Sequence, residues 1–528
     1  MVKPTLADTS NSGIYVVEGP ARGQPIPVDG DSVTAFISPA PRGPVDRAVS
    51  VSSTEEFHKI FGVPEYNCRL EFAVRQFFAN GGTNAVIVRV SGTKACNRIY
   101  LPGEAGELVL AAKNPGPLEH LRASVDYDDI DADEPQNFNL IVQRLRSSGS
   151  AWIDAQECYR NVSTDPGSRD YLGYVLSQSD LVALVGRAPQ LRPHATIKPT
   201  TLRQAGYVAA LAECVNSPPP TDYDLIGSVA QGTGLNALEH ISDIGQVCLV
   251  SGAEGAPLGP VALLAADRFC RDHQALLIID PPSRWESVED VLQDQERSGF
   301  SSPNAVTWFP GVCALNGQGE RVYTSIVGSV AAALEPVDQI VGVRQLHNAG
   351  PVMLRGGVRP TAKLENNDIR RLARAGINSL VQRSPLHLQL MGNVTQARYG
   401  SIASDWTELE LRRQVLFILR RIRQGTLWTF FQESNPEMWQ EVESQVSAFL
   451  TELHARSVLA GEHASLSYFV KCDSDTNAGL TGRHGEVAFV VGFAPRIPGE
   501  FMAFRFQRSH GACRISELGW QAGFACAI

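Results

Sequence analysis

The densest group of side chains that could bind a metal ion lies between Asp126 and Glu134, in the sequence DYDDIDADE. As a calcium-binding loop that begins at Asp129, it would offer carboxylates at the first, third and fifth positions. However, Glu134 stands where glycine is required, and Leu140 stands where a bidentate glutamate is required. We therefore expect a solvated acidic loop rather than a metal site.

Local motifs of catalytic or nucleotide-binding sites are absent from the sequence. It contains no GxSxG, Walker or HExxH pattern, and its His residues are isolated. Gly232–Ala237 (GTGLNA) is weakly similar to a dinucleotide-binding fingerprint but lacks the acidic residue about 20 positions later. The 10 Cys residues form no CxxC pair, which disfavours zinc and thioredoxin-type sites and favours buried free thiols. We expect no enzyme activity and no cofactor.

A helix predicted over Glu408–Gln424 carries the sharpest charged feature of the chain. Its five arginines are Arg412, Arg413, Arg420, Arg421 and Arg423. One interpretation is a solvated face whose arginines pair with nearby carboxylates. The other is a contact for an acidic protein partner, because arginine is enriched at interfaces and binds carboxylates bidentately.

Composition excludes two classes of direct ligand. The 528 residues include 46 Lys and Arg against 56 Asp and Glu, a net charge of −10, which argues against a dedicated nucleic-acid binder. No apolar run approaches the roughly 20 residues of a membrane helix, and the first residues lack the apolar core of a signal peptide. The charged fraction of 19% is below the usual value of about 25%, which suggests a surface covered by other subunits. We expect assembly in a cytoplasm.

The elements of the first two thirds alternate between an α/β pattern and a β-rich one. A helix at Arg69–Asn80 lies between strands at Ser32–Ile37 and Asn84–Val90, an order typical of a parallel α/β layer. From Ile99 to His194, short β-like runs predict an inserted β module. The α/β pattern then returns, with strands expected at Tyr223–Val229, Gln246–Val250 and Ala275–Ile279 and a helix at Val261–His273.

The last third predicts a separate unit. Its expected helices are Asn367–Ala375, Glu408–Gln424 and Glu437–Ala455, and its expected strands are Tyr468–Lys471, Glu486–Phe493 and Phe501–Phe506. Beyond Arg508 the sequence has no clear periodicity and is expected to form a tail. Two strands, Gly13–Glu18 and the region from Phe501 onward, have no evident partner in the chain, so they must pair with something else.

A series of collinear motifs resembles one family, the contractile tail sheath proteins of myophage tails, R-type pyocins and extracellular contractile injection systems. Gly13–Glu18 resembles the family's opening PGVYVEE strand, and Ala73–Gly82 with Ala85–Val90 resembles AVRQFFxNGGxxAYVVRV. Further matches are Val33–Ile37 with Pro41–Pro44, Asp165–Tyr171, Cys270–Pro282, Trp308–Pro310, Arg412–Glu433, Val491–Pro495 and Pro498–Phe501. Where the family carries WGART, this sequence has Met391–Thr395 (MGNVT).

The resemblance implies an α/β multidomain fold with a subtilisin-like layout and no protease activity. The expected parts are an N-terminal arm (1–22), an α/β domain in two pieces (23–97 and 201–345), an inserted β-rich outer domain (98–200), a C-terminal sheath domain (346–508) and a C-terminal arm (509–528). It also implies stacked homo-hexameric rings around an inner tube, contraction that drives the tube through a target cell envelope, and tube, baseplate and tail terminator proteins as partners. The particle would be a phage tail or an extracellular injection system.

Two sets of residues are expected at contacts between subunits. The first set lies in the strands of the two arms: Gly13, Ile14, Tyr15, Val16 and Val17 near the N-terminus, and Phe501, Met502, Phe504 and Phe506 near the C-terminus. The five arginines of Glu408–Gln424 are the candidate contact with the tube or an adjacent subunit. The alternative functions are a cytosolic α/β hydrolase-like enzyme and a non-contractile shell or scaffold protein.

Overall fold

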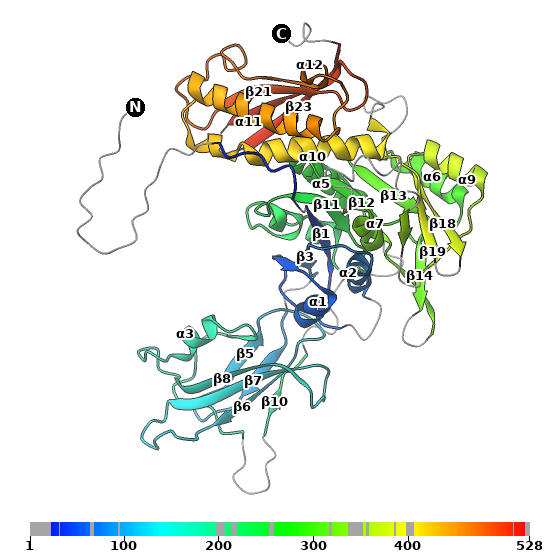
Figure 1. Cartoon of the computed structure of the whole chain (residues 1–528). Helices are drawn as coiled ribbons and strands as arrows, with labels where there is room; N and C mark the ends of the chain where they lie inside the picture. The colour runs from blue at the N-terminus through cyan, green and yellow to red at the C-terminus, as the bar shows by residue number, and fades with distance from the viewer. Residues whose placement is uncertain are drawn as a thin grey trace, which may run out of the picture. The chain divides into compact units, whose positions relative to one another are not determined.

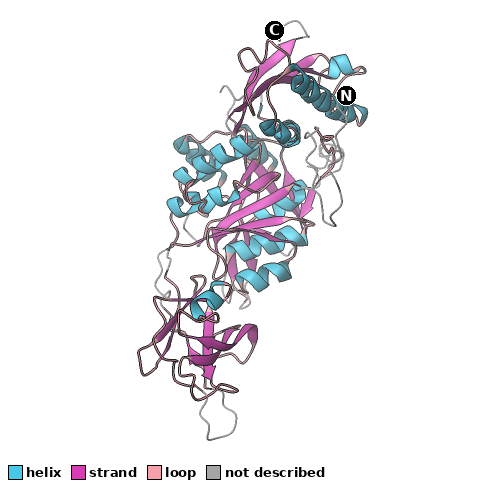
Figure 2. Ribbon diagram, turned by 90° about the vertical axis from the view of Figure 1, so that its left-hand side faces the viewer, coloured by secondary structure: helices cyan, strands magenta, loops and turns pink. Residues whose placement is uncertain are grey.

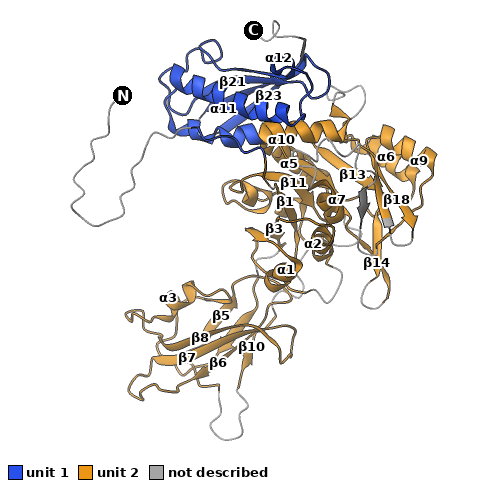
Figure 3. Cartoon of the chain, viewed as in Figure 1, with its two compact units in different colours: residues 1–28, 421–528 blue, residues 29–420 orange. Residues whose placement is uncertain are grey.

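In a computed structural model, the chain forms two compact units (Figure 3). The larger unit comprises residues 29–420, and the smaller comprises residues 1–28 and 421–528. The described residues are 23–30, 32–63, 68–92, 95–196, 206–212, 219–252, 258–315, 319–335, 352–354, 358–384, 387–397, 406–509 and 512–522. No helix among them is long and apolar enough to cross a membrane.

A nine-stranded sheet forms the centre of the larger unit (Figure 1). Its order is β16-β19-β18-β13-β12-β11-β1-β3-β2, and all neighbours from β18 to β3 run parallel. The strands are β1 (Val33–Pro39), β2 (Ala48–Val51), β3 (Ala85–Val90), β11 (Ile244–Leu249), β12 (Leu276–Ile279), β13 (Ala305–Phe309), β16 (Val352–Leu354), β18 (Asn378–Ser384) and β19 (His387–Met391). The parallel α/β layer predicted from the sequence is confirmed.

Helices cover both faces of this sheet, as Figure 2 shows. Successive strand residues point to opposite faces, so Phe36 packs in one hydrophobic cluster and Ala35 and Ile37 pack in another. The first cluster includes side chains of α1 (Thr54–Phe61), α2 (Arg69–Ala79), α7 (Val327–Leu334) and α10 (Leu409–Gly425). The second includes side chains of α4 (Asp222–Ile226), the 3₁₀ helix η1 (Gly234–Leu238) and α5 (Pro260–His273).

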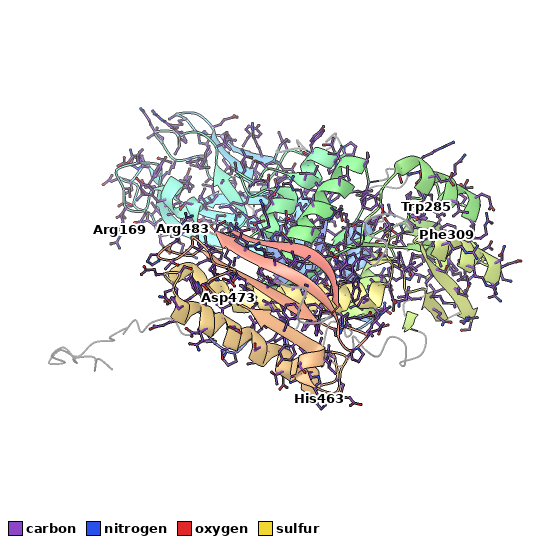
Figure 4. All side chains as sticks on the ribbon, turned by 90° about the horizontal axis from the view of Figure 1, so that it is seen from above. Arg169, Trp285, Phe309, His463, Asp473 and Arg483 are labelled. Carbon is purple, nitrogen blue, oxygen red and sulfur yellow. The ribbon has the colours of Figure 1, made fainter. Side chains whose placement is uncertain are left out.

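A smaller hydrophobic cluster joins α6 (Val288–Ser298) and α9 (Asn366–Arg374) beside the main sheet. The rings of Trp285 and Phe309 meet edge to face at 6.3 Å between centroids, and Figure 4 labels both. A three-stranded sheet of β14 (Val312–Leu315), β15 (Arg321–Thr324) and β17 (Arg359–Pro360) also lies in this part of the chain.

The β module predicted between the two pieces of the α/β domain is present. One sheet has the order β10-β6-β7-β8 and the other β4-β5-β9, and both are antiparallel. The elements are β4 (Arg98–Leu101), β5 (Leu108–Ala112), β6 (His120–Asp126), β7 (Asn137–Leu145), β8 (Ile153–Ser163), α3 (Leu172–Ser177), β9 (Val182–Leu184) and β10 (Val208–Ala209). Leu101, Leu110, Phe138 and Leu172 are fully buried in their common core.

The smaller unit packs helices on a four-stranded antiparallel sheet of order β20-β21-β22-β23. After the end of α10, its elements are η4 (Leu427–Phe431), α11 (Pro436–Ala455), α12 (Ala464–Ser467), β20 (Tyr468–Lys471), β21 (Val487–Phe493), β22 (Glu500–Ser509) and β23 (Ala512–Ala522). The helices expected at Glu408–Gln424 and Glu437–Ala455 are confirmed to within one residue at each end.

Three sequence expectations differ from the structure. The strand expected at Tyr223–Val229 is the short helix α4, because Thr221 and Asp224 form a reciprocal capping box at its start. The tail expected beyond Arg508 is the strand β23. The last domain was expected to begin at residue 346, but the strands β16, β18 and β19 belong to the nine-stranded sheet of the larger unit. The C-terminal part of the smaller unit begins at Arg421.

Candidate assembly surfaces

Ligands of open α/β sheets bind at the carboxyl ends of the parallel strands, and here an ion pair fills that position. Asp280 follows β12, and its Oδ2 lies 3.8 Å from Nη2 of Arg69. The Arg69 guanidinium also donates to Oγ of Ser251 and lies 5.1 Å from the Tyr323 ring centroid. Burial raises the pKa of Asp280, and Arg69 opposes that shift. The cavity beside the pair holds about 30 Å³, enough for one water molecule.

The glycine-rich segment Gly232–Ala237 is part of a tight turn packed against protein. Gly232 and Gly234 both have positive φ, and a Cβ atom on Gly234 would lie 2.7 Å from the backbone of Gly227. The Gly234 N–H donates to Oδ1 of Asp46 at 2.9 Å. The glycines are therefore explained by the turn and by its close approach to the neighbouring backbone.

The acidic loop after β6 uses its first carboxylate for local hydrogen bonds. Asn139 Nδ2 donates to Oδ1 of Asp126 at 2.7 Å, and the Asp128 N–H donates to the same oxygen. Arg192 lies over the Tyr127 ring at 3.8 Å. In the part of the chain that the structure describes, no three His, Cys, Asp or Glu residues are grouped so that they could hold a metal ion.

The arginines of α10 do not form the exposed face that both sequence interpretations assumed. Arg412, Arg413 and Arg420 are 8%, 3% and 4% exposed. Arg412 Nε donates to Oδ1 of Asn304 at 2.8 Å, and Arg413 donates to the carbonyl of Leu334. Arg420 Nε lies 2.7 Å from Oδ1 of Asp243. These three guanidinium groups therefore hold α10 within the larger unit.

The other two arginines of the helix, Arg421 and Arg423, lie in the smaller unit. Arg421 is 5% exposed and Arg423 is half-buried. The carbonyl of Arg423 accepts a hydrogen bond from Arg508, a fully buried side chain of β22 that also donates to Oγ1 of Thr426 at 2.7 Å. The end of α10 is thus tied to the sheet of its own unit.

The strand that contains Phe501, Met502, Phe504 and Phe506 is not an unpaired arm. These residues belong to β22, which pairs with β21 on one side and with β23 on the other. Their side chains are at most 2% exposed. The expectation that this strand lacks a partner within the chain is therefore wrong. The other predicted arm strand, Gly13–Val17, lies outside the described residues.

At one edge of this sheet lies β23, a strand that the sequence pattern does not predict. It pairs with β22 from Ser509↔Ala512 to Glu500↔Ala522, and among the described residues no strand pairs with its other edge. Its side chains are exposed or half-buried from Ala512 to Trp520. Two irregularities hide its alternation in the sequence: a register shift opposite Ala503 and Phe504, and Gly519 with a φ of +83°.

Comparisons with known proteins find the fold but no close relative. No family model matches the sequence, and no curated protein matches it. A sheath tail protein from Listeria innocua aligns with a TM-score of 0.60 at 12% identity, over 93% of this chain and 96% of its own. One from Desulfitobacterium hafniense aligns with a TM-score of 0.54 at 11% identity, over 94% and 99%.

A third similar structure is the contracted sheath complex of PVC, an extracellular contractile injection system. Its TM-score is 0.50 at 14% identity, over 93% of this chain and 96% of that one. The chain therefore has the mixed α/β, multi-sheet fold of contractile sheath proteins along nearly its whole length. The alignments extend over both compact units and over the inserted β module, since they leave out 7% of the chain or less.

Proposed function

We propose that this protein is the subunit of a contractile sheath. The observation that carries the proposal is the fold likeness over 93–94% of the chain to proteins described as sheath tail proteins and as a contracted sheath. The subunits stack as hexameric rings around an inner tube, and contraction drives the tube through the envelope of a target cell. In this proposal the α/β domain has the subtilisin-like layout of the family and serves as a scaffold.

Strand addition between subunits supplies the contacts that keep the rings connected. The Gly13–Val17 strand of one subunit pairs with the open edge of β23 in another, which satisfies backbone groups that a lone edge leaves to water. Because the donor and acceptor surfaces differ, the contact is head-to-tail and generates an open helix rather than a closed dimer.

Other partners follow from the same proposal. The tube protein lies inside the rings, a baseplate protein contacts the first ring, and a tail terminator contacts the last. The particle is either a phage tail or an extracellular injection system, and the sheath assembles in the bacterial cytoplasm. The buried arginines of α10 offer little surface to the tube, so the contact proposed for them is confined to Arg423, the half-buried member of the set.

Electron microscopy of the purified protein tests the proposal most directly. A sheath subunit forms helical tubes roughly 200 Å wide, a width estimated from the diameters of its domains. Two populations of tube, with different lengths per ring, distinguish a contractile sheath from a non-contractile shell or scaffold. A monodisperse monomer at high concentration contradicts the proposal.

Deletion of residues 1–20 tests the role of the arm. The truncated chain retains its folded core and melting temperature but no longer polymerises, because the edge of β23 loses the strand that adds to it. Polymerisation of the truncated chain to the same extent as the full chain would refute the role of Gly13–Val17.

The hydrolase alternative predicts an open site at the carboxyl edge of the parallel sheet. The structure instead has a cavity of about 30 Å³ there, beside the Arg69 and Asp280 side chains. A screen with ester and peptide substrates tests this alternative: turnover that is abolished by Asp280→Asn would favour the enzyme.

A further inference from the structure

A groove runs along α11 in the smaller unit, beside residues 23–28. Its volume is about 690 Å³. The buried side chains of Ile26, Val28 and Phe449 contribute to its lining, and the exposed small residues Ser444 and Ala448 lie near the middle of its α11 side. Small side chains in the middle of a helix allow the backbone of a partner segment to approach closely.

The groove is built by hydrogen bonds that fix both of its walls. The Gly23 N–H donates to Oε1 of Glu441 at 2.6 Å. Gln445 Nε2 donates to the carbonyl of Gly425 at 2.9 Å and to the carbonyl of Gln24. Trp428 Nε1 donates to Oε1 of Gln445 at 2.9 Å. Because these bonds fix the two walls relative to each other, a ligand would not have to order them on binding.

Carboxylates line both ends of the groove. Glu437 and Glu441 line one end and Glu452 lines the other, and α11 contains no Lys or Arg from Pro436 to Ala455. Glu452 contacts Arg456, which follows the helix, at 2.8 Å and is 48% exposed. At 1.5 Å per residue, the outer carboxylates are about 22 Å apart along the helix. That separation exceeds the length of most small ligands.

We propose that this groove binds a basic segment of a partner protein, with an apolar centre that packs against Ala448 and Lys or Arg residues that reach the carboxylates at both ends. A different protein is favoured over a second copy, because the arginines that this chain concentrates in α10 are buried or half-buried and are poorly placed to reach a groove on another subunit. The site is distinct from the strand edges proposed for self-assembly, so it adds a second kind of partner to this unit.

Fluorescence anisotropy with a labelled peptide tests the proposal on the unpolymerised full chain. The probe is a peptide of about 15 residues, which as a helix spans the same 22 Å, with Leu and Ala in its centre and Lys at both ends. A matched peptide carries Glu in place of Lys. We expect binding of the Lys peptide alone, and weaker binding as salt is raised.

Variants assign the binding to the groove. The triple variant with Glu437→Gln, Glu441→Gln and Glu452→Gln binds the Lys peptide about tenfold more weakly than the parent. Each ion pair at the surface contributes roughly a factor of two to the affinity. The Gln side chain at 441 keeps an acceptor for the Gly23 N–H. The matched control removes three other carboxylates, by Glu433→Gln, Glu462→Gln and Glu500→Gln, at exposed residues of the same unit that do not line the groove. The control variant binds as the parent does.

Three results would overturn the proposal. Equal weakening by the control variant would mean that charge alone, rather than the groove, attracts the peptide. Much tighter peptide binding after deletion of residues 1–20 would mean that the chain's own N-terminal segment occupies the groove. If the parent does not bind the peptide but self-associates, and the triple variant loses this self-association, the groove binds a second copy of the chain. Since peptide binding is measured on monomers, the absence of peptide binding is distinguishable from the absence of tube formation.

Discussion

Replacement of Arg420 by Met tests whether the arginines of α10 stabilise the fold rather than a contact with a partner. Arg420 Nε lies 2.7 Å from Oδ1 of Asp243, and its Nη1 donates to the carbonyl of Gln274 at 3.2 Å. The Arg420 and Asp243 side chains are 4% and 15% exposed. In Arg420→Met the methionine fills the space of the arginine stem, but the ion pair and both hydrogen bonds are lost.

The expected loss of stability follows from the burial of the pair. Removal of one member of a buried ion pair costs about 3 kcal/mol, because the remaining charge loses its partner away from water. Unfolding entropy of about 2.1 cal/mol/K per residue, applied to residues 29–420, converts this loss into a decrease of roughly 4 °C in melting temperature. Asp243→Asn should cost less, and the double variant should cost less than the two single losses added together.

Differential scanning calorimetry of the monomer measures the decrease, and hydrogen exchange assigns the transition to residues 29–420. The control is Arg75→Met, whose arginine is 46% exposed and pairs with Glu71 at 3.1 Å. An exposed pair of this kind contributes about 0.5 kcal/mol, a decrease below roughly 1 °C. If Arg420→Met melts within a degree of Arg75→Met, the structural role of the buried arginine is refuted. Charge reversal at Arg420 therefore tests folding before it tests assembly.

Two further changes test the packing of the larger unit. Gly328→Ala should destabilise it by more than about 2 kcal/mol in thermal unfolding, because the new Cβ atom would lie 1.8 Å from the carbonyl oxygen of Ala73; Gly167→Ala, whose nearest contact is an ordinary 3.5 Å, should change little. Burial raises the pKa of the Cys248 and Cys270 thiols, so both should resist a thiol reagent at neutral pH until the chain is unfolded, and modification of either in the native protein would contradict the buried core.

Periodicity predicted the elements whose side chains have one dominant environment. The helix at Arg69–Asn80 and the strand at Ala275–Ile279 were found within one residue of their expected bounds, because a continuous apolar face or run leaves few alternatives. It failed at Tyr223–Val229, where the capping of α4 by Thr221 outweighs β-favouring residue types. It also failed at β23, an exposed edge strand in which a register shift and Gly519 interrupt the alternation.

The sequence by itself determined the α/β core, the inserted β module and a resemblance carried by collinear motifs, since these depend on local patterns of apolar, turn and glycine residues. Only the tertiary structure decided which side of each charged helix faces solvent. The sequence pattern of α10 predicts an exposed basic face. Three of its five arginines instead form hydrogen bonds with Asn304, Leu334 and Asp243, which lie in segments distant in the sequence. The acidic groove of α11 depends equally on residues 23–28, which are more than 400 positions away in the chain. Burial of a charge depends on partners that the chain brings together only when it folds.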